Sequence, residues 1–407
     1  MKKELLIPKD HRGGASYTET QGVIAGNFIF VGGQMSLDEA GRVVGEDIMT
    51  QTRNAFESVK RILAEGGASM GDVVKHNVYI NCDAEMASNF IAELDQVRLE
   101  YFSDPGPTTT ETRVGLDREG ALILVEAVAV VGVEKQRIMP SGHWNWDRPL
   151  PFSHGWKVGD VIFIGGQRSL DQYGQPLGGD DIAVQTHNAF QNMEKVLEEA
   201  GGSRNNLLRQ NTYYRFIGEG RDVTGYWEKM TAARMDHFSV PSACGTGVRV
   251  TGFPQPEELI QVEGIAVLGQ NKKRLMPANH WDWSIPDNSF TQGWQIGNLV
   301  FIGGQISVDK NARAVGHDME TQTRNVFEFI RNTLYEAGVD ESAVVKINSY
   351  FNAEGDWSQI RETSATIARI QKQYYPDPGP ASTSVRVTGF AFEDLMIEIE
   401  VIAVIEN

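Results

Sequence analysis

The chain of 407 residues contains one domain-sized pattern three times. The segments GNFIFVGGQ, GDVIFIGGQ and GNLVFIGGQ begin at residues 26, 159 and 297. Each is followed by an amphipathic segment that starts at an aspartate, and each repeat closes with an apolar stretch such as MIEIEVIAVI. The starting points of successive repeats are 133 and 138 residues apart, which is too long for a solenoid unit and suits a whole domain. We therefore predict three tandem domains, over residues 1–136, 137–273 and 274–407.

The first repeat predicts the order of the elements. Phe28 to Val31 is an apolar run ended by a glycine pair, as in a buried strand. Residues 48–66 have apolar residues at helical spacing, and residues 73–80 form a second apolar run. A second helix over 85–102 and strands over 108–116 and 121–131 complete the order β-β-α-β-α-β-β. This order is typical of an α+β domain with one sheet and two helices on one face.

Composition excludes several classes of protein. Lys plus Arg total 37 and Asp plus Glu total 54, a net charge of -17, which disfavours nucleic acid as a partner. The chain has two cysteines, Cys82 and Cys244, too few for a disulfide framework, so we expect a reducing compartment. The N-terminus has no apolar segment typical of a signal peptide, and no apolar run is long enough to span a membrane. We expect a cytoplasmic protein with no membrane partner.

The joints between repeats are rich in tryptophan. They read RIMPSGHWNW over residues 137–146 and RLMPANHWDW over residues 274–283. A flexible linker would be rich in glycine and serine, so these segments should pack. Two interpretations stay open, a clamp between neighbouring repeats and a binding role. The residues concerned are His143, Trp144, Trp146, His280, Trp281 and Trp283.

The glycine-glycine-glutamine strand end, the first helix ending in EAG, the VVK strand, the P-x-P segment and the final IEIEVIAV strand together resemble the Rid family, also called the YjgF family. The resemblance covers almost the whole chain three times. It implies a chorismate-mutase-like fold and, because members are usually homotrimers with ligand sites between subunits, a pseudo-trimer with three non-identical clefts. A higher oligomer stays open.

The resemblance also implies an activity. Members of the family deaminate reactive enamines and imines by adding water, without a cofactor. An arginine holds the substrate carboxylate, for which its planar fork is suited, and a glutamate positions the water. We therefore expect a small-molecule substrate. The histidines lack metal-ligand spacing, so we expect no metal.

The residues depart from the family pattern at the arginine. The arginine position falls on Thr109, Gly245 and Ser382, and a frequent cysteine position on Glu111, Gly247 and Ser384. An arginine stands four residues further on in each repeat, as Arg113, Arg249 and Arg386. Side chains alternate along a strand, so an offset of four returns to the same face. These arginines are candidates for substrate binding, or they are structural and pair with a glutamate across the sheet.

The glutamate position of the family keeps its acid in the third repeat. It falls on Leu124, Gln261 and Glu398. A second glutamate follows two residues later as Glu126, Glu263 and Glu400, for which pairing with the arginine of the same repeat is the expected role. We therefore predict the active cleft where Glu398, Ser384 and Arg386 lie.

Further candidates are weaker. Gly33, Gly166 and Gly304 could let backbone approach a ligand, or they mark a strand bulge. Arg168, which replaces Met35 and Ile306 of the other repeats, could add an anion contact. Cys244 would need a base or a positive neighbour to act as a nucleophile.

The sequence predicts a cofactor-independent enamine or imine deaminase, or a related hydrolase of C–N bonds, that acts on a small carboxylated or polar nitrogenous metabolite between repeats. Two alternatives stay open. The chain could bind or sense a small molecule without catalysis, or it could be a chaperone-like scaffold. The ribonuclease activity sometimes ascribed to the family fits the net charge of -17 less well.

Overall fold

Three six-stranded mixed sheets, one in each repeat, form the framework of the protein. The computed structural model describes residues 2–8, 20–218, 223–238, 240–269, 271–278, 280–281, 284–285, 288–289, 291–311, 313–375 and 378–406. The strand order in repeat 1 is β1-β2-β3-β6-β4-β5, and the other two sheets repeat it. At one edge of each sheet the last two strands, such as β4 and β5, run parallel. The other neighbouring strands of the sheet, including those at the opposite edge, are antiparallel. The prediction of an α+β domain present three times is confirmed.

The elements follow one another in the same order in each repeat. Repeat 1 contains β1 (Lys3–Leu6), β2 (Gly22–Ala25), β3 (Phe28–Gln34), α1 (Ile48–Glu65), β4 (Val73–Ile80), α2 (Ala87–Tyr101), β5 (Thr108–Arg113) and β6 (Ile123–Val130). Repeat 2 contains β7 (Lys135–Ile138), β8 (Gly155–Val158), β9 (Val161–Arg168), α3 (Ile182–Glu199), β10 (Leu207–Tyr214), α4 (Val223–Met235), β11 (Cys244–Arg249) and β12 (Ile260–Val267). Repeat 3 contains β13 (Lys272–Leu275), β14 (Ser284–Ile285), β15 (Asn288–Ser289), β16 (Gly293–Ile296), β17 (Leu299–Ile306), α5 (Met319–Glu336), β18 (Val344–Phe351), α6 (Trp357–Tyr374), β19 (Ala381–Arg386) and β20 (Ile397–Val404). Short 3-10 helices lie at Met70–Asp72, Ala84–Met86, Arg204–Asn206 and Glu341–Ala343.

Each repeat begins with an edge strand that the predicted order lacks. In these edge positions β1 pairs with β2, β7 with β8, and β13 with β16. They are four residues long and carry charged side chains, as in KELL and KKRL, so the apolar alternation that reveals a strand is too short to be seen. The predicted domain boundaries, after residues 136 and 273, fall inside β7 and β13.

The first helix of each repeat has the same start and the same end. Asp47, Asp181 and Asp318 cap α1, α3 and α5, each accepting a backbone N–H of the first turn. A glycine with a left-handed φ, such as Gly67 at 73°, follows each helix and ends it. Among the described residues, none of the helices has the length and apolarity that crossing a bilayer requires.

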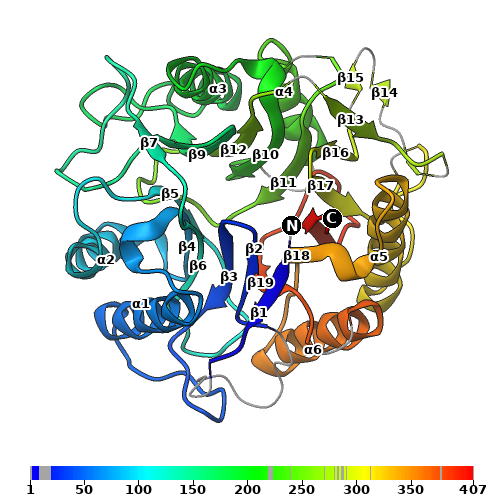
Figure 1. Cartoon of the computed structure of the whole chain (residues 1–407), viewed down its shortest axis with the longest axis horizontal. Helices are drawn as coiled ribbons and strands as arrows, with labels where there is room; N and C mark the ends of the chain where they lie inside the picture. Colours follow the sequence, from blue (N-terminus) through cyan, green and yellow to red (C-terminus); the bar gives the residue numbers. More distant parts are fainter. Residues whose placement is uncertain are drawn as a thin grey trace.

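The three repeats close into a ring with helices outside and sheets inside (Figure 1). Strand β5 lies against β9, β11 against β17, and β19 against β3. We call these joints the 1/2, 2/3 and 3/1 clefts, after the repeats that form them. Backbones approach closely there because Gly32, Gly165 and Gly303 have no side chain, and a Cβ on each would collide with the neighbouring repeat.

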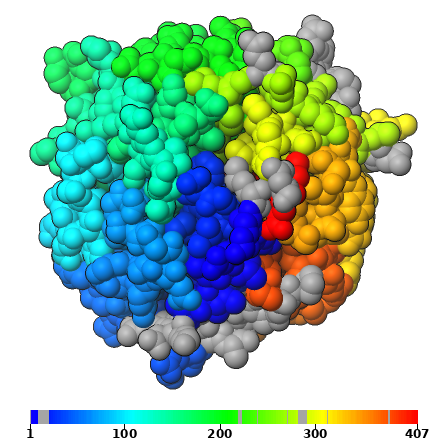
Figure 2. Space-filling view, in the orientation of Figure 1, coloured from blue at the N-terminus to red at the C-terminus, as the bar shows by residue number. Residues whose placement is uncertain are grey.

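The two ends of the chain meet where the ring closes. Lys3 donates its backbone N–H to Glu406 at 2.9 Å and its ammonium group to the carbonyl of Val344 at 2.8 Å. The space-filling view shows the first and last segments in contact near the centre of one face (Figure 2). The edge strand β1 therefore ties repeat 1 to repeat 3.

Three buried ion pairs surround the pseudo-threefold axis, and each joins two repeats. Glu126 pairs with Lys346 at 2.7 Å, Glu263 with Lys75 at 2.6 Å, and Glu400 with Arg209. The expected pairing of these glutamates with the arginine of their own repeat is therefore wrong. The side chains on the inner face of each sheet lie against another repeat. Each of the three carboxylates therefore pairs with a cation of that other repeat.

Candidate functional site

The 2/3 cleft contains a cavity that residues of repeats 2 and 3 line together. Its polar groups are the carboxyl group of Glu398, the guanidinium group of Arg234, the hydroxyl group of Thr246, which is hydrogen bonded to Glu400, and the indole N–H groups of Trp227 and Trp281. Apolar groups and glycines form the remaining surface. They are Trp227, Gly245, Gly247, Trp281, Gly304, Ile306, Phe390, Ala391 and Leu395.

Glu398 is the acid that the sequence singled out. It lies on β20 and accepts the backbone N–H of Gly247 on β11 at 3.1 Å, across the joint between repeats 3 and 2. Burial raises the pKa of Glu398 to about 8, the Gly247 N–H opposes this rise, and neighbouring Glu400 adds to it. The carboxyl group is therefore largely protonated at neutral pH and can exchange a proton near that pH.

Glycine is required where Glu398 crosses the strand beside it. A Cβ on Gly304 would collide with the carboxyl group of Glu398, and in the same way Gly166 faces Gln261 and Gly33 faces Leu124. The strand pairing is also irregular beside these glycine pairs, as between Ile302 and Gln305. The predicted bulge is thus present. Gly304 also lines the 2/3 cavity, so the two interpretations of this glycine are compatible.

Arg234 is the functional candidate that the sequence argument missed. It lies on α4 and is 1% exposed, with its guanidinium carbon 4.8 Å from the ring centre of Trp227. Burial lowers the pKa of Arg234, while Tyr214 and Glu398 oppose this effect. An anion in the cavity would stabilise this buried charge. Alignment of the three second helices places Arg98, Arg234 and Gln371 at one position, which is the signal that could have revealed it.

The 1/2 cleft has the same construction but is filled by the protein's own side chains. Gln261 stands at the acid position and accepts the backbone N–H of Glu111 at 3.0 Å, as Glu398 does from Gly247. Arg98, the equivalent of Arg234, forms ion pairs with Asp95 at 2.9 Å and with Glu111. Burial opposes the charge on Arg98, but Glu111 and Asp95 raise its pKa. A carboxylate of the chain therefore occupies the place next to this arginine.

Arg168 also belongs to this filled cleft. It pairs with Glu258 through two hydrogen bonds, and its guanidinium carbon lies 5.6 Å from the ring centre of Trp144. Both charged groups are buried, so the predicted anion contact of Arg168 is already made by a glutamate.

The 3/1 cleft lacks both ionisable groups at these positions. Leu124 stands at the acid position, and Gln371 donates to the hydroxyl group of Ser382 at 2.9 Å. Ser384 lies on β19, which faces repeat 1, whereas Glu398 faces repeat 2. The structure therefore separates Ser384 from Glu398. The predicted site is corrected because β18 lies between β19 and β20, so Ser384 and Glu398 lie on separate strands that face different repeats.

Arg113, Arg249 and Arg386 hold neighbouring repeats together away from the 2/3 cavity. Their backbone N–H groups donate to Gly252, Gly389 and Gly115 of the next repeat, at 2.8, 2.9 and 3.2 Å. Each side chain lies over that glycine, where a Cβ would collide with it. Arg113 and Arg386 donate to backbone carbonyls, and no ion pair between these arginines and a glutamate is found among the described residues. Four residues of strand move a side chain about 13 Å, to the strand end and out of the cleft.

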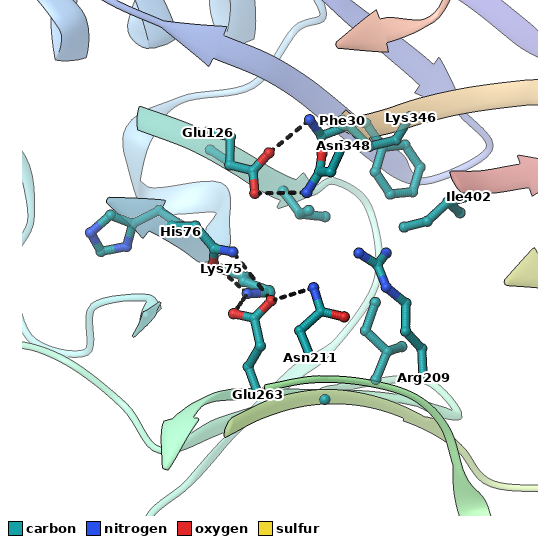
Figure 3. Close-up of a pocket in the computed structure, with 15 residues that line it drawn as sticks. Phe30, Lys75, His76, Glu126, Arg209, Asn211, Glu263, Lys346, Asn348 and Ile402 are labelled. Atoms are coloured by element: carbon teal, nitrogen blue, oxygen red, sulfur yellow. Dashed lines mark hydrogen bonds and ion pairs between the residues drawn. The ribbon is translucent and has the colours of Figure 1, made fainter. Parts of the chain in front are cut away.

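The axial cavity is a second enclosed space, shown in Figure 3. It is lined by the ion pairs of Glu126 and Glu263, with Asn348 and Asn211 donating to these carboxylates at 3.2 and 3.4 Å. The hydroxyl groups of Tyr213 and Tyr350 meet beside it at 3.0 Å. Because each carboxylate already has a cation and further donors, this cluster stabilises the ring.

Cys244 and the joint tryptophans can also be placed. Cys244 is fully buried, and burial raises the pKa of its thiol to about 12, which disfavours a nucleophilic role. Trp144 donates to Gln167 at 3.0 Å in the 1/2 cleft, and Trp281 lines the 2/3 cavity. Trp283 lies outside the described residues. Within the described part of the chain, no three His, Cys, Asp or Glu side chains are grouped as a metal ion needs, and the expectation of no metal or cofactor stays a prediction.

The profile of the endoribonuclease L-PSP family matches residues 13–131, 147–268 and 284–405. The chain belongs to this family. One stretch of 111 residues, 27% of this chain, is 40% identical to a RutC family protein of Pyrococcus abyssi and covers 84% of that protein. A stretch of 108 residues, 26% of this chain, is 34% identical to a protein of Acinetobacter baylyi named 3-aminoacrylate deaminase RutC and covers 82% of that protein.

A solved chorismatase resembles the whole ring of this L-PSP family chain. The two structures superpose with a TM-score of 0.50 at 15% identity, over 82% of this chain and 93% of the other. At this identity the likeness concerns the fold alone. Relatives of single repeats are thus named as deaminases, and the three-repeat architecture has a counterpart of known structure.

Proposed function

We propose that the chain deaminates 2-imino acids, or their enamine tautomers, in the 2/3 cleft. Water adds to the C=N carbon of R–C(=NH)–COO⁻, the resulting carbinolamine loses ammonia, and R–CO–COO⁻ remains. No oxidant or cofactor enters this balance. The relatives named as deaminases support the reaction type, and the pairing of Arg234 with Glu398 in one cavity supports the place.

The internal comparison with the 1/2 cleft carries the proposal. There Arg98 binds the carboxylate of Glu111. The position of Glu111 is Gly247 on β11, so no side-chain carboxylate extends from that position into the 2/3 cleft. A substrate carboxylate in the cavity would lie beside the Trp227 ring and reach Arg234, held by the two parallel N–H donors of the guanidinium fork.

Glu398 supplies the proton transfers. Its Oε1 is fixed by the Gly247 N–H, and Oε2 has no hydrogen-bond partner among the described residues. The protonated acid gives its proton to the imine nitrogen while water attacks carbon. The carboxylate then takes a proton from the added water, and a second transfer to nitrogen lets ammonia leave. A pKa of about 8 suits a group that must serve as acid and base near neutral pH.

An imine-trapping assay tests the proposal. An amino-acid oxidase generates 2-imino acids, semicarbazide traps them, and a deaminase lowers the trapped signal. We expect wild-type protein to lower the signal and Glu398→Gln to lose about 100-fold or more of this activity. Gln261→Leu, which places the residue type of Leu124 at the acid position of the 1/2 cleft, is the matched control and should keep the activity.

The result also separates the deaminase from the alternatives. If no 2-imino acid is consumed by wild-type protein, the proposal is wrong. Binding of 2-oxo acids without turnover would then favour a binding or sensor protein, and the absence of both would favour a scaffold. Equal activity in Glu398→Gln and wild type would remove the 2/3 cleft as the site.

A further inference from the structure

We infer that the substrate of the 2/3 cleft has a bulky apolar side chain, like the 2-imino acids formed from leucine or phenylalanine. The inference rests on the proposed function, since it names the substrate class of the same site. It concerns the apolar part of the cavity lining, where Ile306, Leu395 and Phe390 lie.

The three repeats differ most in chemistry at this wall. In the 1/2 cleft the two equivalent positions hold Arg168 and Glu258, which form a buried ion pair. In the 2/3 cleft they hold Ile306 and Leu395, which belong to one apolar cluster with Trp281 and Phe390. A charged wall can bind a polar substrate group that replaces one partner of its ion pair. An apolar wall makes the free energy of binding more favourable only when it covers apolar surface of the substrate.

The other side of the cavity also presents an apolar surface. Gly245 and Gly247 stand where the 1/2 cleft has Thr109 and Glu111, so β11 presents bare backbone to the cavity. The ring of Trp227 fills the space beside Gly247, because a Cβ there would collide with it. Trp227 replaces Ile91 and Ser364 of the other repeats, so a broad aromatic surface is particular to this cleft.

A polar substrate side chain would find few partners along this wall. Thr246 is already bonded to Glu400, and the two ionisable groups are needed for the carboxylate and the imine, which leaves the indole N–H groups of Trp227 and Trp281. An acidic or hydroxylated side chain would therefore replace only part of its hydrogen bonds to water. We expect discrimination of at least about tenfold against such substrates and against the small imino acid from alanine.

Competition in the trapping assay tests the inference. Imino acids from leucine, phenylalanine, alanine and aspartate are generated by suitable oxidases, and kcat/KM is compared. Calorimetry with the corresponding 2-oxo acids, which are stable products, measures binding without turnover. We expect the leucine and phenylalanine compounds to be preferred in both measurements. Preference for the alanine or aspartate compound would overturn the inference and leave the proposed function intact, whereas no turnover of any compound would overturn the proposed function.

Exchange of the wall sharpens the test. Ile306→Arg with Leu395→Glu copies the ion pair of the 1/2 cleft and should abolish the apolar preference. The matched control introduces the same pair at the equivalent positions of the 3/1 cleft, as Met35→Arg with Ala121→Glu, and should keep the preference. If the double variants do not fold, Leu395→Ala provides the measurement. It should shift the preference from the leucine to the phenylalanine compound, and an unchanged ratio would contradict the proposed wall.

Discussion

In the 1/2 cleft a glutamate of the chain stands at the position that holds glycine in the 2/3 cleft, where the ring of Trp227 lies instead. Both clefts have an arginine on the second helix, a side-chain oxygen at the acid position and a backbone N–H that holds that oxygen. They differ at three places. The 1/2 cleft has Glu111 where the 2/3 cleft has Gly247, and Gln261 where it has Glu398. The wall positions hold Arg168 and Glu258 in the 1/2 cleft, and Ile306 and Leu395 in the 2/3 cleft. Buried arginines need a carboxylate in either case. We therefore expect the 1/2 cleft, where β5 provides the carboxylate, to be structural, and the 2/3 cleft, where β11 provides none, to accept a ligand.

The largest effect should be the loss of stability when the internal carboxylate loses its arginine. Arg98→Met leaves Glu111 and Asp95 buried beside the missing cation, which should cost about 3–5 kcal/mol in the free energy of unfolding. Arg234→Met should cost clearly less, because Gly247 provides no carboxylate to be left behind. Urea denaturation of both variants measures the difference, and equal losses would show that the two arginines have the same role.

Ligand affinity should depend more on Arg234 than on Arg98, which is the opposite of the order expected for stability. Arg234→Gln, which copies Gln371 of the third repeat, removes the fork for the substrate carboxylate and should raise KM and the Kd of 2-oxo acids about 10- to 100-fold. Gln371→Ala in the 3/1 cleft is the matched control. An unchanged Kd in Arg234→Gln would place the carboxylate elsewhere.

Much of this comparison could be predicted from the sequence, and the rest depends on how the three repeats are arranged in space. The repeats, the helix starts at Asp47 and Asp181 and the retained acid Glu398 follow from local pattern. The partner of Glu398 does not, because the sequence of one repeat contains no information on which neighbour covers which sheet edge. The sequence placed Arg113, Arg249 and Arg386 near a ligand for a related reason. Alternation predicts on which face of a strand a side chain lies, but the cleft covers only part of the length of that strand. Short charged strands such as β7 escape pattern recognition altogether.

The acid of the 2/3 cleft should make stability depend on pH. Glu398 has a pKa of about 8 in the folded protein, against 4.5 for an unperturbed glutamate. Between these values the folded state retains a proton that the unfolded state has lost, so Glu398 lowers the free energy of unfolding as pH rises through this window. Glu398→Gln should therefore gain stability relative to wild type, by at least about 2 °C in Tm at pH 9 compared with pH 4.5. Glu65→Gln, at the exposed end of α1, should follow the wild type, and parallel curves for Glu398→Gln would contradict the buried acid.

The smallest effect should be a new weak site in the filled cleft. Glu111→Gly removes the internal carboxylate and leaves Arg98 with Asp95, so the 1/2 cleft then resembles the 2/3 cleft at this position. A small 2-oxo acid, 2-oxobutanoate, should bind there as a substitute carboxylate, and equilibrium dialysis should show a second site in addition to that of the wild type. Turnover should not increase, because Gln261 cannot donate and accept the proton that Glu398 exchanges. If the number of sites stays unchanged while the variant remains folded, Arg98 does not recognise a free carboxylate, and the analogy that assigns this role to Arg234 would lose its support.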